Sequence, residues 1–334
     1  MHDIVLIPGD GIGPEITKSV TTILDEAGAD INWIECTAGL TAQEELGNPL
    51  PDETLDAIDQ YRLALKGPLT TPVGAGFRSV NVAMRKKFNL HSNIRPAKTL
   101  PHIHSRYEDV NLVMFRENTE GLYIGKEQWV KENSHAESIA VVTREASEKV
   151  IRSAFEYAKK KGRKKVTLVH KANILKFTCG LFMEVGEEIS KDYPNIEYED
   201  LIVDNMAMQM VLDPKQFDVI VTTNLFGDIL SDLASGLVGG LGLTGAANIG
   251  DDAAMFEAVH GSAPDIAGQN KANPIAFLLS ALMMLEHIGE DDLADRIRQA
   301  VYYTLENKEV CTPDIGGSGS TTSFTKAVCY NLRK

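Results

Sequence analysis

Short apolar runs typical of buried strands alternate with stretches of helical length through most of this chain. A strand over residues 3–7 precedes a helical run over residues 16–27, and a strand over residues 217–223 precedes a helical pattern that begins at residue 224. Such alternation is typical of α/β proteins. The sequence therefore predicts an α/β fold with a largely parallel sheet.

The length and the charge of the chain narrow its class. With 334 residues it is too long for one ordinary core, so we expect two domains or one large domain with a second lobe. Its 43% hydrophobic and 24% charged residues are typical of a soluble globular protein. The net charge of -14 argues against a nucleic-acid or membrane partner, because both require a basic surface.

Cysteine usage and apolar runs bear on the compartment. The four cysteines, Cys36, Cys179, Cys311 and Cys329, show no close pairing, which favours a reducing compartment. The apolar runs over residues 4–7 and 276–285 are too short for a signal peptide and a membrane span, respectively. We expect a cytoplasmic protein, although a mitochondrial matrix protein whose transit peptide had been removed would look the same.

Residues 224–240 predict a helix in which Asp228 and Asp232 lie four residues apart. An apolar stripe is expected beside them, formed by Leu225, Ile229, Leu230, Leu233 and Leu237. The two carboxylates repel each other, so we expect a positive charge between them. Mg2+ or Mn2+ suits such oxygen ligands. The alternative is a solvated helix face.

Two glycine-containing loops have some features of nucleotide sites. Residues 8–15 join a strand to a helix, as a dinucleotide fingerprint does, and Glu35 lies near the position of a ribose-binding acid. The glycines read GxGxG, however, with Pro14 and Glu15 in the turn, so we interpret this segment as a tight structural turn. Taken alone, the small-residue loop over residues 261–264 also predicts no nucleotide site.

Polar residues between two strand patterns suggest an anion site. Thr70, Thr71, Ser79 and Asn81 supply hydroxyl and amide groups. Three arginines, Arg85, Arg95 and Arg116, lie near loop or strand ends. Because a guanidinium binds a carboxylate in a bidentate manner, they are candidates for a carboxylate-binding cluster. Each could equally be an ordinary surface residue.

Further candidates follow along the chain. Tyr123 precedes residues 126–142, which alternate polar and apolar side chains and predict a protruding hairpin. Lys171 at a strand end could be catalytic if its pKa were lowered, or simply exposed. Asp204 ends another strand pattern, and the methionines that follow it are expected in the core.

Six motifs occur in order along nearly the whole chain. They are GDGIGPE, GPLTTPVGAGFRSVNVAMR, RENTEG followed by Tyr123, VHKANI, NLFGDILSDLASGLVGGLG and HGSAPDIAGQNKANP. Together they resemble the isocitrate and isopropylmalate dehydrogenase family. The resemblance implies a two-domain α/β fold distinct from the Rossmann fold. Residues 1–98 and 241–334 would form a large domain, residues 99–240 a small one, and residues 121–143 a clasp between the subunits of a dimer with shared active sites.

The same resemblance implies roles for individual residues. Asp228 and Asp232, with Asp204 of the partner subunit, would hold Mg2+ or Mn2+, and Arg85, Arg95 and Arg116 would bind substrate carboxylates. Ser79 and Asn81 occupy the positions that bind the extra carboxylate of isocitrate, whereas an isobutyl side chain would leave them unpaired. Homoisocitrate differs by one methylene, which a pocket distinguishes by only about 1–3 kcal/mol, so homoisocitrate dehydrogenase stays open as an alternative.

The cofactor implied by the resemblance is NAD. NADP-using relatives commonly carry lysine and tyrosine where this chain has Asp265 and Ile266, and an aspartate would repel a 2'-phosphate. The adenosine side would also be lined by His260, Gly261, Ala263 and Asn273. Thr70 and Thr71 would lie nearer the nicotinamide. The early glycine turn would then contact the cofactor at most indirectly.

The implied chemistry is oxidation of isocitrate followed by loss of CO2, which gives 2-oxoglutarate. Lys171 of the partner subunit would accept the hydroxyl proton, and Tyr123 would help to protonate the product carbon. Two other classes are weighed against this. A regulatory subunit would usually lack part of the tyrosine, lysine and aspartate set, and a hydroxyacid dehydrogenase without metal would stay active in a chelator.

Overall fold

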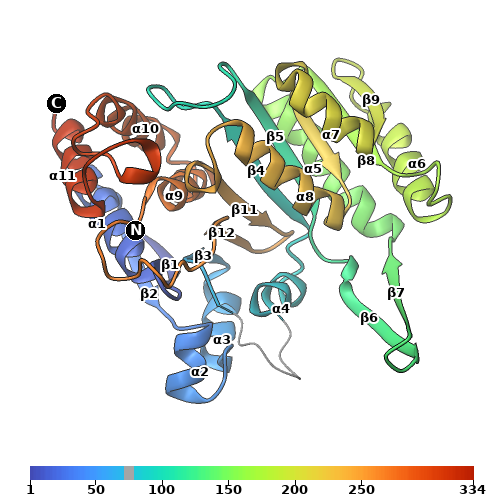
Figure 1. The fold of residues 1–334 in the computed structure, drawn as a ribbon, viewed down its shortest axis with the longest axis horizontal. Helices are drawn as coiled ribbons and strands as arrows, with labels where there is room; N and C mark the ends of the chain where they lie inside the picture. Colours follow the sequence, from blue (N-terminus) through green and yellow to red (C-terminus); the bar gives the residue numbers. More distant parts are fainter. Residues whose placement is uncertain (71–78) are drawn as a thin grey trace.

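A single ten-stranded mixed sheet runs through the molecule, a computed structural model that describes residues 1–70 and 79–334. The strand order is β2-β1-β3-β12-β11-β4-β5-β10-β8-β9 (Figure 1). The strands are β1 His2–Ile7, β2 Ile31–Glu35, β3 Leu63–Lys66, β4 Ser92–Lys98, β5 Asn111–Glu117, β8 Lys165–His170, β9 Glu197–Ile202, β10 Val219–Thr222, β11 Gly245–Ile249 and β12 Ala254–Ala258.

The sheet consists of two parallel blocks joined by antiparallel strands. Strands β2, β1, β3 and β12 are parallel to one another, as are β5, β10, β8 and β9. Between the blocks, β11 pairs antiparallel with both β12 and β4, and β4 pairs antiparallel with β5. The predicted α/β fold with a largely parallel sheet is confirmed.

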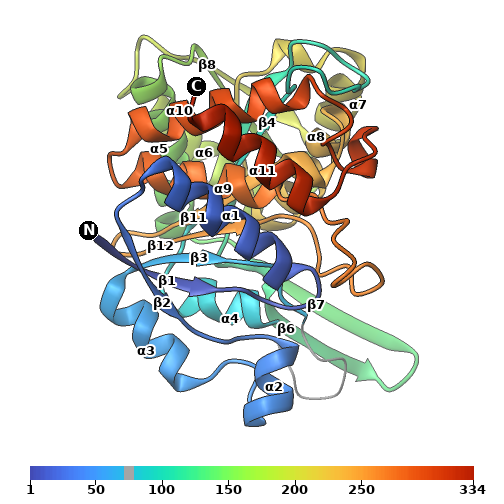
Figure 2. The same cartoon turned by 90° about the vertical axis from the view of Figure 1, so that its left-hand side faces the viewer.

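Helices cover both faces of the sheet (Figures 1 and 2). The helices on one face are α1 Gly13–Ala27, α5 Arg144–Lys161, α6 Thr178–Ser190, α9 Ile275–His287, α10 Asp291–Leu305 and α11 Thr321–Leu332. The opposite face carries α3 Asp52–Tyr61, α4 Val80–Lys87, α7 Val203–Leu212 and α8 Asn224–Leu237, with α2 Leu40–Leu46 beside α3 (Figure 2).

Four hydrophobic clusters result from this arrangement, two on each face. On one face, α1, α9, α10 and α11 pack over the first block of strands, and α5 and α6 pack over the second. On the other face, α3 and α4 cover the first block, and α7 and α8 cover the second. Ile94 on β4 touches both clusters of its face. Two lobes therefore share one sheet, and β4 lies at their junction.

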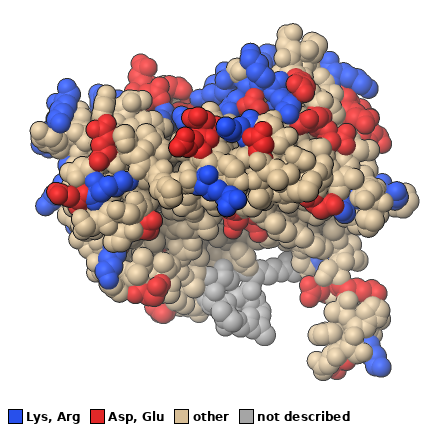
Figure 3. All heavy atoms as spheres, turned by 45° about the horizontal axis from the view of Figure 1, so that its top comes forward, with Lys and Arg blue, Asp and Glu red and all other residues tan. Residues whose placement is uncertain are grey.

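A two-stranded hairpin projects from the second lobe (Figures 1 and 3). Strand β6 Gly121–Lys131 pairs antiparallel with β7 His135–Val141, which confirms the hairpin predicted from the alternating pattern. Its large apolar side chains Trp129, Val130 and Ile139 are each more than half exposed. Acidic and basic side chains are interspersed over the face in Figure 3. No described helix is long and apolar enough to span a membrane.

The early glycine turn between β1 and α1 makes close contacts with other loops. Gly11 has a φ of +60°, and a Cβ there would lie 2.0 Å from the carbonyl oxygen of Ser262. The carboxylate of Asp10 accepts hydrogen bonds from the backbone amides of Leu40, Thr41 and Thr70. The turn thus holds together loops that are distant in sequence.

The burial of α7 and α8 corrects two expectations. In α8 only Leu230 and Leu237 of the predicted stripe are buried, while Ile229 is 59% exposed. In α7 Met206 and Met210 are in the core, but Met208 is 52% exposed. The buried face of α8 includes Gly227, Ser231 and Ala234, because that face packs closely on β5. The expectation that all these methionines lie in the core is therefore wrong for Met208, and the apolar stripe of α8 is partly on the surface.

Candidate functional site

The candidate site lies between the helices of the two lobes, on the face of the sheet covered by α4 and α8. Helix α4 supplies Arg85, strands β4 and β5 supply Arg95 and Arg116, and α8 supplies the two predicted metal ligands, Asp228 and Asp232. The three arginines, far apart in sequence, come together as predicted. Their positive charges act on one another, because Arg85 and Arg116 each lower the pKa of Arg95.

Arg116 is buried under the N-terminal turn of α8. Its Nε and Nη2 donate to the side-chain oxygen of Asn224 over 3.0 and 2.8 Å, and its Nη1 donates to Asp228. Asn224 and Asp228 are one helical turn apart, so they face the same guanidinium. Gly227 permits this approach, since a Cβ there would lie 2.5 Å from the Cγ of Arg116.

Arg95 connects the two aspartates of α8. Its Nη1 lies 3.3 Å from Asp232 Oδ1 and 2.7 Å from Ser231 Oγ, and its Nη2 lies 3.8 Å from Asp228 Oδ1. Burial and then the charge of Arg116 lower the pKa of Arg95 to about 10. The positive charge expected between Asp228 and Asp232 is, within one chain, this guanidinium.

Helix α4 contributes polar atoms that face this cluster from the first lobe. Ser79 caps the helix by accepting from the backbone amide of Val82. Two buried atoms, Asn81 Oδ1 and Arg85 Nε, have no hydrogen-bond partner among the described residues. Buried polar atoms are rarely left unpaired. These two atoms are therefore open to a polar ligand.

Tyr123 on β6 completes the cluster from the base of the hairpin. Its hydroxyl donates to Asp228 Oδ2 over 2.6 Å, and the guanidinium of Arg116 lies 5.0 Å from its ring centroid. Burial and the hydrogen bond to Asp228 raise the pKa of Tyr123. Burial alone would raise the pKa of Asp228, but the charge of Arg116 and the hydrogen bond from Tyr123 lower it overall.

Lys171 and Asp204 form a separate ion pair. Lys171 follows β8, and Asp204 lies in the first turn of α7, where 70% of its side chain is exposed. Within the described residues, no three His, Cys, Asp or Glu side chains converge as a metal site would require. Asp228 and Asp232 are hard oxygen donors that suit Mg2+ or Mn2+.

The loop that carries most of the predicted cofactor residues contacts the early glycine turn. The Thr70 hydroxyl lies 2.7 Å from that of Ser262, and Ile12 donates its backbone amide to the Ser262 carbonyl over 2.8 Å. The side chain of Asn273 donates to Asp314 over 2.9 Å, and His260 Nε2 is buried without a described partner. The remaining members of this set are Gly261, Ala263, Asp265 and Ile266, of which Gly261 and Asp265 are exposed. Thr71 lies outside the described residues.

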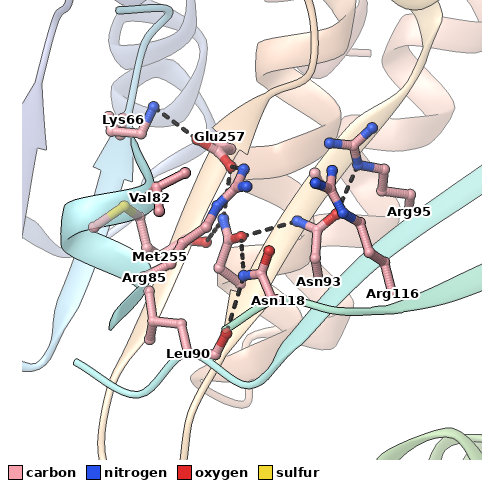
Figure 4. Close-up of polar contacts among 12 residues, drawn as sticks. Lys66, Val82, Arg85, Leu90, Asn93, Arg95, Arg116, Asn118, Met255 and Glu257 are labelled. Carbon is pink, nitrogen blue, oxygen red and sulfur yellow. Dashed lines mark hydrogen bonds and ion pairs between the residues drawn. The ribbon is translucent and has the colours of Figure 1, made fainter. Parts of the chain in front are cut away.

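Several buried polar residues next to the arginines were missed by the sequence analysis. Lys66 and Glu257 form an ion pair of 2.7 Å, and Asn93, Asn118 and Asn248 form hydrogen bonds beside it (Figure 4). The sequence does contain a signal for this buried pair, because Lys66 and Glu257 are charged residues inside otherwise apolar strand patterns. Such residues are almost never fully buried unless they are paired.

A cavity of about 730 Å³ lies on the opposite face of the sheet. Its floor includes Ile94, Ala247 and Phe256. These residues alternate along β4, β11 and β12 with Asn93, Asn248 and Glu257, so their side chains point to the other face. This cavity is therefore separate from the arginine cluster.

The fold and this site define a class of metabolic dehydrogenase. The family model described as isocitrate/isopropylmalate dehydrogenase matches residues 3–328. The chain belongs to this family, as the six motifs indicated.

Individual relatives agree with this assignment. The mitochondrial NAD-dependent isocitrate dehydrogenase catalytic subunit 5 of Arabidopsis thaliana is 48% identical over 98% of this chain and 87% of its own. A mitochondrial regulatory subunit of NAD-dependent isocitrate dehydrogenase from Dictyostelium discoideum is 49% identical over 100% and 94%. A chloroplastic 3-isopropylmalate dehydrogenase of Solanum tuberosum is 48% identical over 91% and 85%. Overall identity therefore does not separate these activities.

A solved structure gives the same fold. The crystal structure of isocitrate dehydrogenase from Methylococcus capsulatus superposes with a TM-score of 0.96 and covers 100% of both chains at 56% identity. The family-type α/β fold expected from the motifs is confirmed.

Proposed function

We propose that this chain catalyses the metal-dependent oxidative decarboxylation of isocitrate to 2-oxoglutarate and CO2, with reduction of NAD. The cluster of Arg85, Arg95 and Arg116 carries this proposal. The charges of Arg116 and Arg85 lower the pKa of Arg95, and the charge of Arg85 lowers that of Arg116, so this cluster would gain from a polyanionic ligand. Isocitrate, with three carboxylates, is such a ligand.

The residues of this chain would bind and orient the substrate. Arg95 and Arg116 would hold two carboxylates from the sheet, and Arg85 would contact the ligand from α4. Ser79 and Asn81 would bind the third carboxylate by donating from the hydroxyl and from the side-chain amide nitrogen, because a carboxylate only accepts hydrogen bonds. An isobutyl group in the same place would leave these polar atoms unpaired.

Proton transfer would use Tyr123 and a lysine from a second subunit. The raised pKa of Tyr123 keeps its hydroxyl protonated at neutral pH, so it can act as an acid toward the product carbon. Lys171 of the partner subunit would accept the proton of the substrate hydroxyl. Mg2+ or Mn2+, held by Asp228 and Asp232 with Asp204 of the partner subunit, would polarise the substrate oxygens when bound.

Shared sites require a dimer, and exposed apolar side chains support one. They lie on the hairpin over residues 121–143 and on α7 and α8, where Met208, Leu212 and Ile229 are each at least half exposed. We propose a homodimer, which could associate into higher oligomers. We also propose two domains, one formed by residues 1–98 and 241–334 and the other by residues 99–240. The lobes that share the central sheet support this division.

NAD is the proposed cofactor. The exposed Asp265, beside the half-buried Ile266, would accept hydrogen bonds from ribose hydroxyls and repel a 2'-phosphate.

The cytoplasmic location stays a prediction, and the plant and slime-mould relatives are named as organellar proteins.

Two alternatives to this function stay open. Homoisocitrate would fit the same arginines with one more methylene. A regulatory subunit is the alternative of another class, and the retention of Tyr123, Lys171, Asp204, Asp228 and Asp232 favours a catalytic chain over it.

Formation of NADH by the purified chain tests the proposal. With isocitrate and Mg2+ we expect rapid reduction of NAD, abolished by a chelator and much slower with NADP. Faster turnover of homoisocitrate would change the substrate but keep the mechanism. Activity that persists in the chelator would contradict the metal assignment, and no turnover of any acid would favour the regulatory class.

A further inference from the structure

A row of buried polar side chains crosses the middle of the sheet beneath the arginine cluster (Figure 4). It starts at Lys66 on β3 and continues through Glu257 on β12, Asn248 on β11 and Asn93 on β4. None of these four residues is more than 5% exposed. Burying so many polar groups in a sheet is costly unless each is paired, so their contacts bear on function.

The first end of the row is a carboxylate bound by two cations. Glu257 Oε2 lies 2.7 Å from Lys66 Nζ, and Oε1 accepts from Arg85 Nη2 over 2.9 Å. Burial alone would raise the pKa of Glu257, but the charges of Lys66 and Arg85 outweigh it and hold this pKa far below its usual range. Glu257 is therefore a fixed negative charge that anchors Arg85.

Asn248 connects this carboxylate to the next strand. Its Nδ2 donates to Glu257 Oε1 over 2.8 Å and to the Met255 carbonyl over 3.2 Å. Its Oδ1 accepts from Asn93 and Asn118, each over 2.9 Å. A side-chain amide offers two donors and two lone pairs, so Asn248 uses its full capacity and has one possible orientation.

The second end of the row is Arg95. Asn93 Oδ1 accepts from Arg95 Nε over 2.7 Å, while Asn93 Nδ2 donates to Asn248. A guanidinium can only donate, which fixes the orientation of the Asn93 amide. Both amides therefore present oxygen toward the Arg95 side and nitrogen toward the Glu257 side.

Strand register supports this continuous path. Asn248 lies opposite Asn93 in the β11–β4 pairing, and Glu257 lies opposite Lys66 in the β12–β3 pairing. The path therefore connects Arg85, which stands on α4 of one lobe, to Arg95 at the junction of the lobes. Aligned amide dipoles between a carboxylate and a guanidinium stabilise both charges.

We propose that Asn248 and Asn93 are positioning residues that hold Arg95 in a fixed relation to Arg85 through Glu257, so that both guanidiniums meet the substrate carboxylates together. This inference rests on the proposed function, because it assigns these arginines to substrate binding. Asn248 itself contacts neither arginine. Its effect on substrate would be transmitted through Asn93 on one side and Glu257 on the other.

The test is substitution of Asn248 by leucine, which has a similar size but no hydrogen-bonding groups. In Asn248→Leu we expect the KM for isocitrate to rise about 10-fold or more, which corresponds to the binding energy of roughly one hydrogen bond. The KM for NAD should change less than about 2-fold. Asn248→Ala, which removes the amide without adding a charge beside Glu257, should shift KM in the same direction. It serves if the leucine variant does not fold.

A matched control separates positioning from general destabilisation. Asn331→Leu removes a half-buried amide that donates to Thr304 over 3.0 Å, far from the arginines in the fold. It should lower the unfolding midpoint and leave both KM values unchanged. In an Arg95→Ala background, Asn248→Leu should raise the KM for isocitrate by a smaller factor, because only the contact through Glu257 to Arg85 remains.

The outcomes separate two claims, the proposed function and the positioning of Arg95 relative to Arg85 through Asn93, Asn248 and Glu257, which we call the relay. A wild-type KM for isocitrate in both Asn248 variants, or an equal effect with and without Arg95, would overturn the relay and leave the proposed function intact. If the wild-type protein does not turn over isocitrate, the proposed function fails. The positioning role is then tested by sulfate binding to the arginines, measured as the rise in unfolding midpoint that sulfate causes. This rise should be smaller in Asn248→Leu than in the control Asn331→Leu.

Discussion

The hydroxyl of Tyr123 donates a hydrogen bond of 2.6 Å to the carboxylate of Asp228. This contact places the candidate acid directly on a candidate metal ligand, beside Arg116. Because the two groups are in contact, a cation bound by Asp228 would make the Tyr123 hydroxyl a stronger acid.

Tyr123→Phe should remove the proton donor and keep the ring. We expect kcat for NADH formation with isocitrate to fall about 100-fold or more, in the range typical of a general acid. Stabilisation of the protein by isocitrate, measured as a rise in unfolding midpoint, should remain. Tyr303→Phe, at an exposed position on α10, is the control and should leave kcat unchanged. Unaltered kcat in Tyr123→Phe would remove this residue from the mechanism.

Shared active sites predict complementation between two inactive variants. Lys171→Met and Asp228→Asn remove residues that do not meet within one chain. Each homodimer should be inactive, but a hybrid dimer contains one site with both changes and one intact site. After subunit exchange we expect about a quarter of wild-type activity, because half of the dimers are hybrids with one intact site each. A mixture no more active than its components would argue for sites within single subunits.

Cofactor choice is expected to follow the charge at residue 265. The double substitution Asp265→Lys and Ile266→Tyr should raise the ratio of kcat/KM for NADP to that for NAD by about 10-fold or more, since one charge contact is worth roughly 1–2 kcal/mol. Asp52→Lys makes the same charge change at a remote exposed position. It should leave the ratio unchanged, and an unchanged ratio in the double variant would contradict the ribose assignment.

Loss of the buried Glu257 charge should destabilise the fold. Glu257→Gln leaves Lys66 as an unpaired buried cation, which typically costs about 3–5 kcal/mol. Adding Lys66→Met removes that cation, so the double variant should be more stable than Glu257→Gln alone. Unfolding in denaturant measures both effects, and a double variant no more stable than Glu257→Gln would exclude direct coupling.

A second ion pair predicts pH-dependent stability. Glu286 on α9 lies 2.8 Å from Lys161 on α5 and also binds Arg298. Burial would raise its pKa, but these cations lower it below 4.5 in the folded state. The stabilisation is therefore present above pH 4.5 and lost as the pH falls through the lowered pKa. Glu286→Gln should cost about 1 kcal/mol at pH 7.

The measurement is the free energy of unfolding from pH 7 down to pH 4. The difference between wild type and Glu286→Gln should shrink only at the acid end. Glu108→Gln, at an exposed carboxylate without an ion pair among the described residues, should match wild type throughout. A difference that grows as the pH falls would have the wrong sign for this pair.

Local patterns in the sequence predicted much of the fold. Alternating strands and helices indicated the largely parallel sheet, and the alternating polar and apolar residues 126–142 indicated the hairpin of β6 and β7. Helical periodicity predicted the apolar stripe of α8, but it does not distinguish a core face from a surface face. Ile229 is part of this stripe and is 59% exposed.

The site was predictable where single residue types carry the chemistry. The three arginines and Tyr123 were named from their positions and from the family motifs. The relay through Asn93 and Asn248 was not, because it depends on which strands pair and in which register. Strands β11 and β4 are separated by more than a hundred residues, so no local pattern reports that their asparagines are opposite.

The substrate is the central claim, and a direct comparison of kcat/KM values tests it best. The purified chain with NAD and Mg2+ should oxidise isocitrate with a kcat/KM at least about 100-fold above that for 3-isopropylmalate, because the latter leaves Ser79 and Asn81 unpaired. One 2-oxoglutarate should form for each NADH. An equal or higher kcat/KM for 3-isopropylmalate would contradict the assignment of isocitrate to this site.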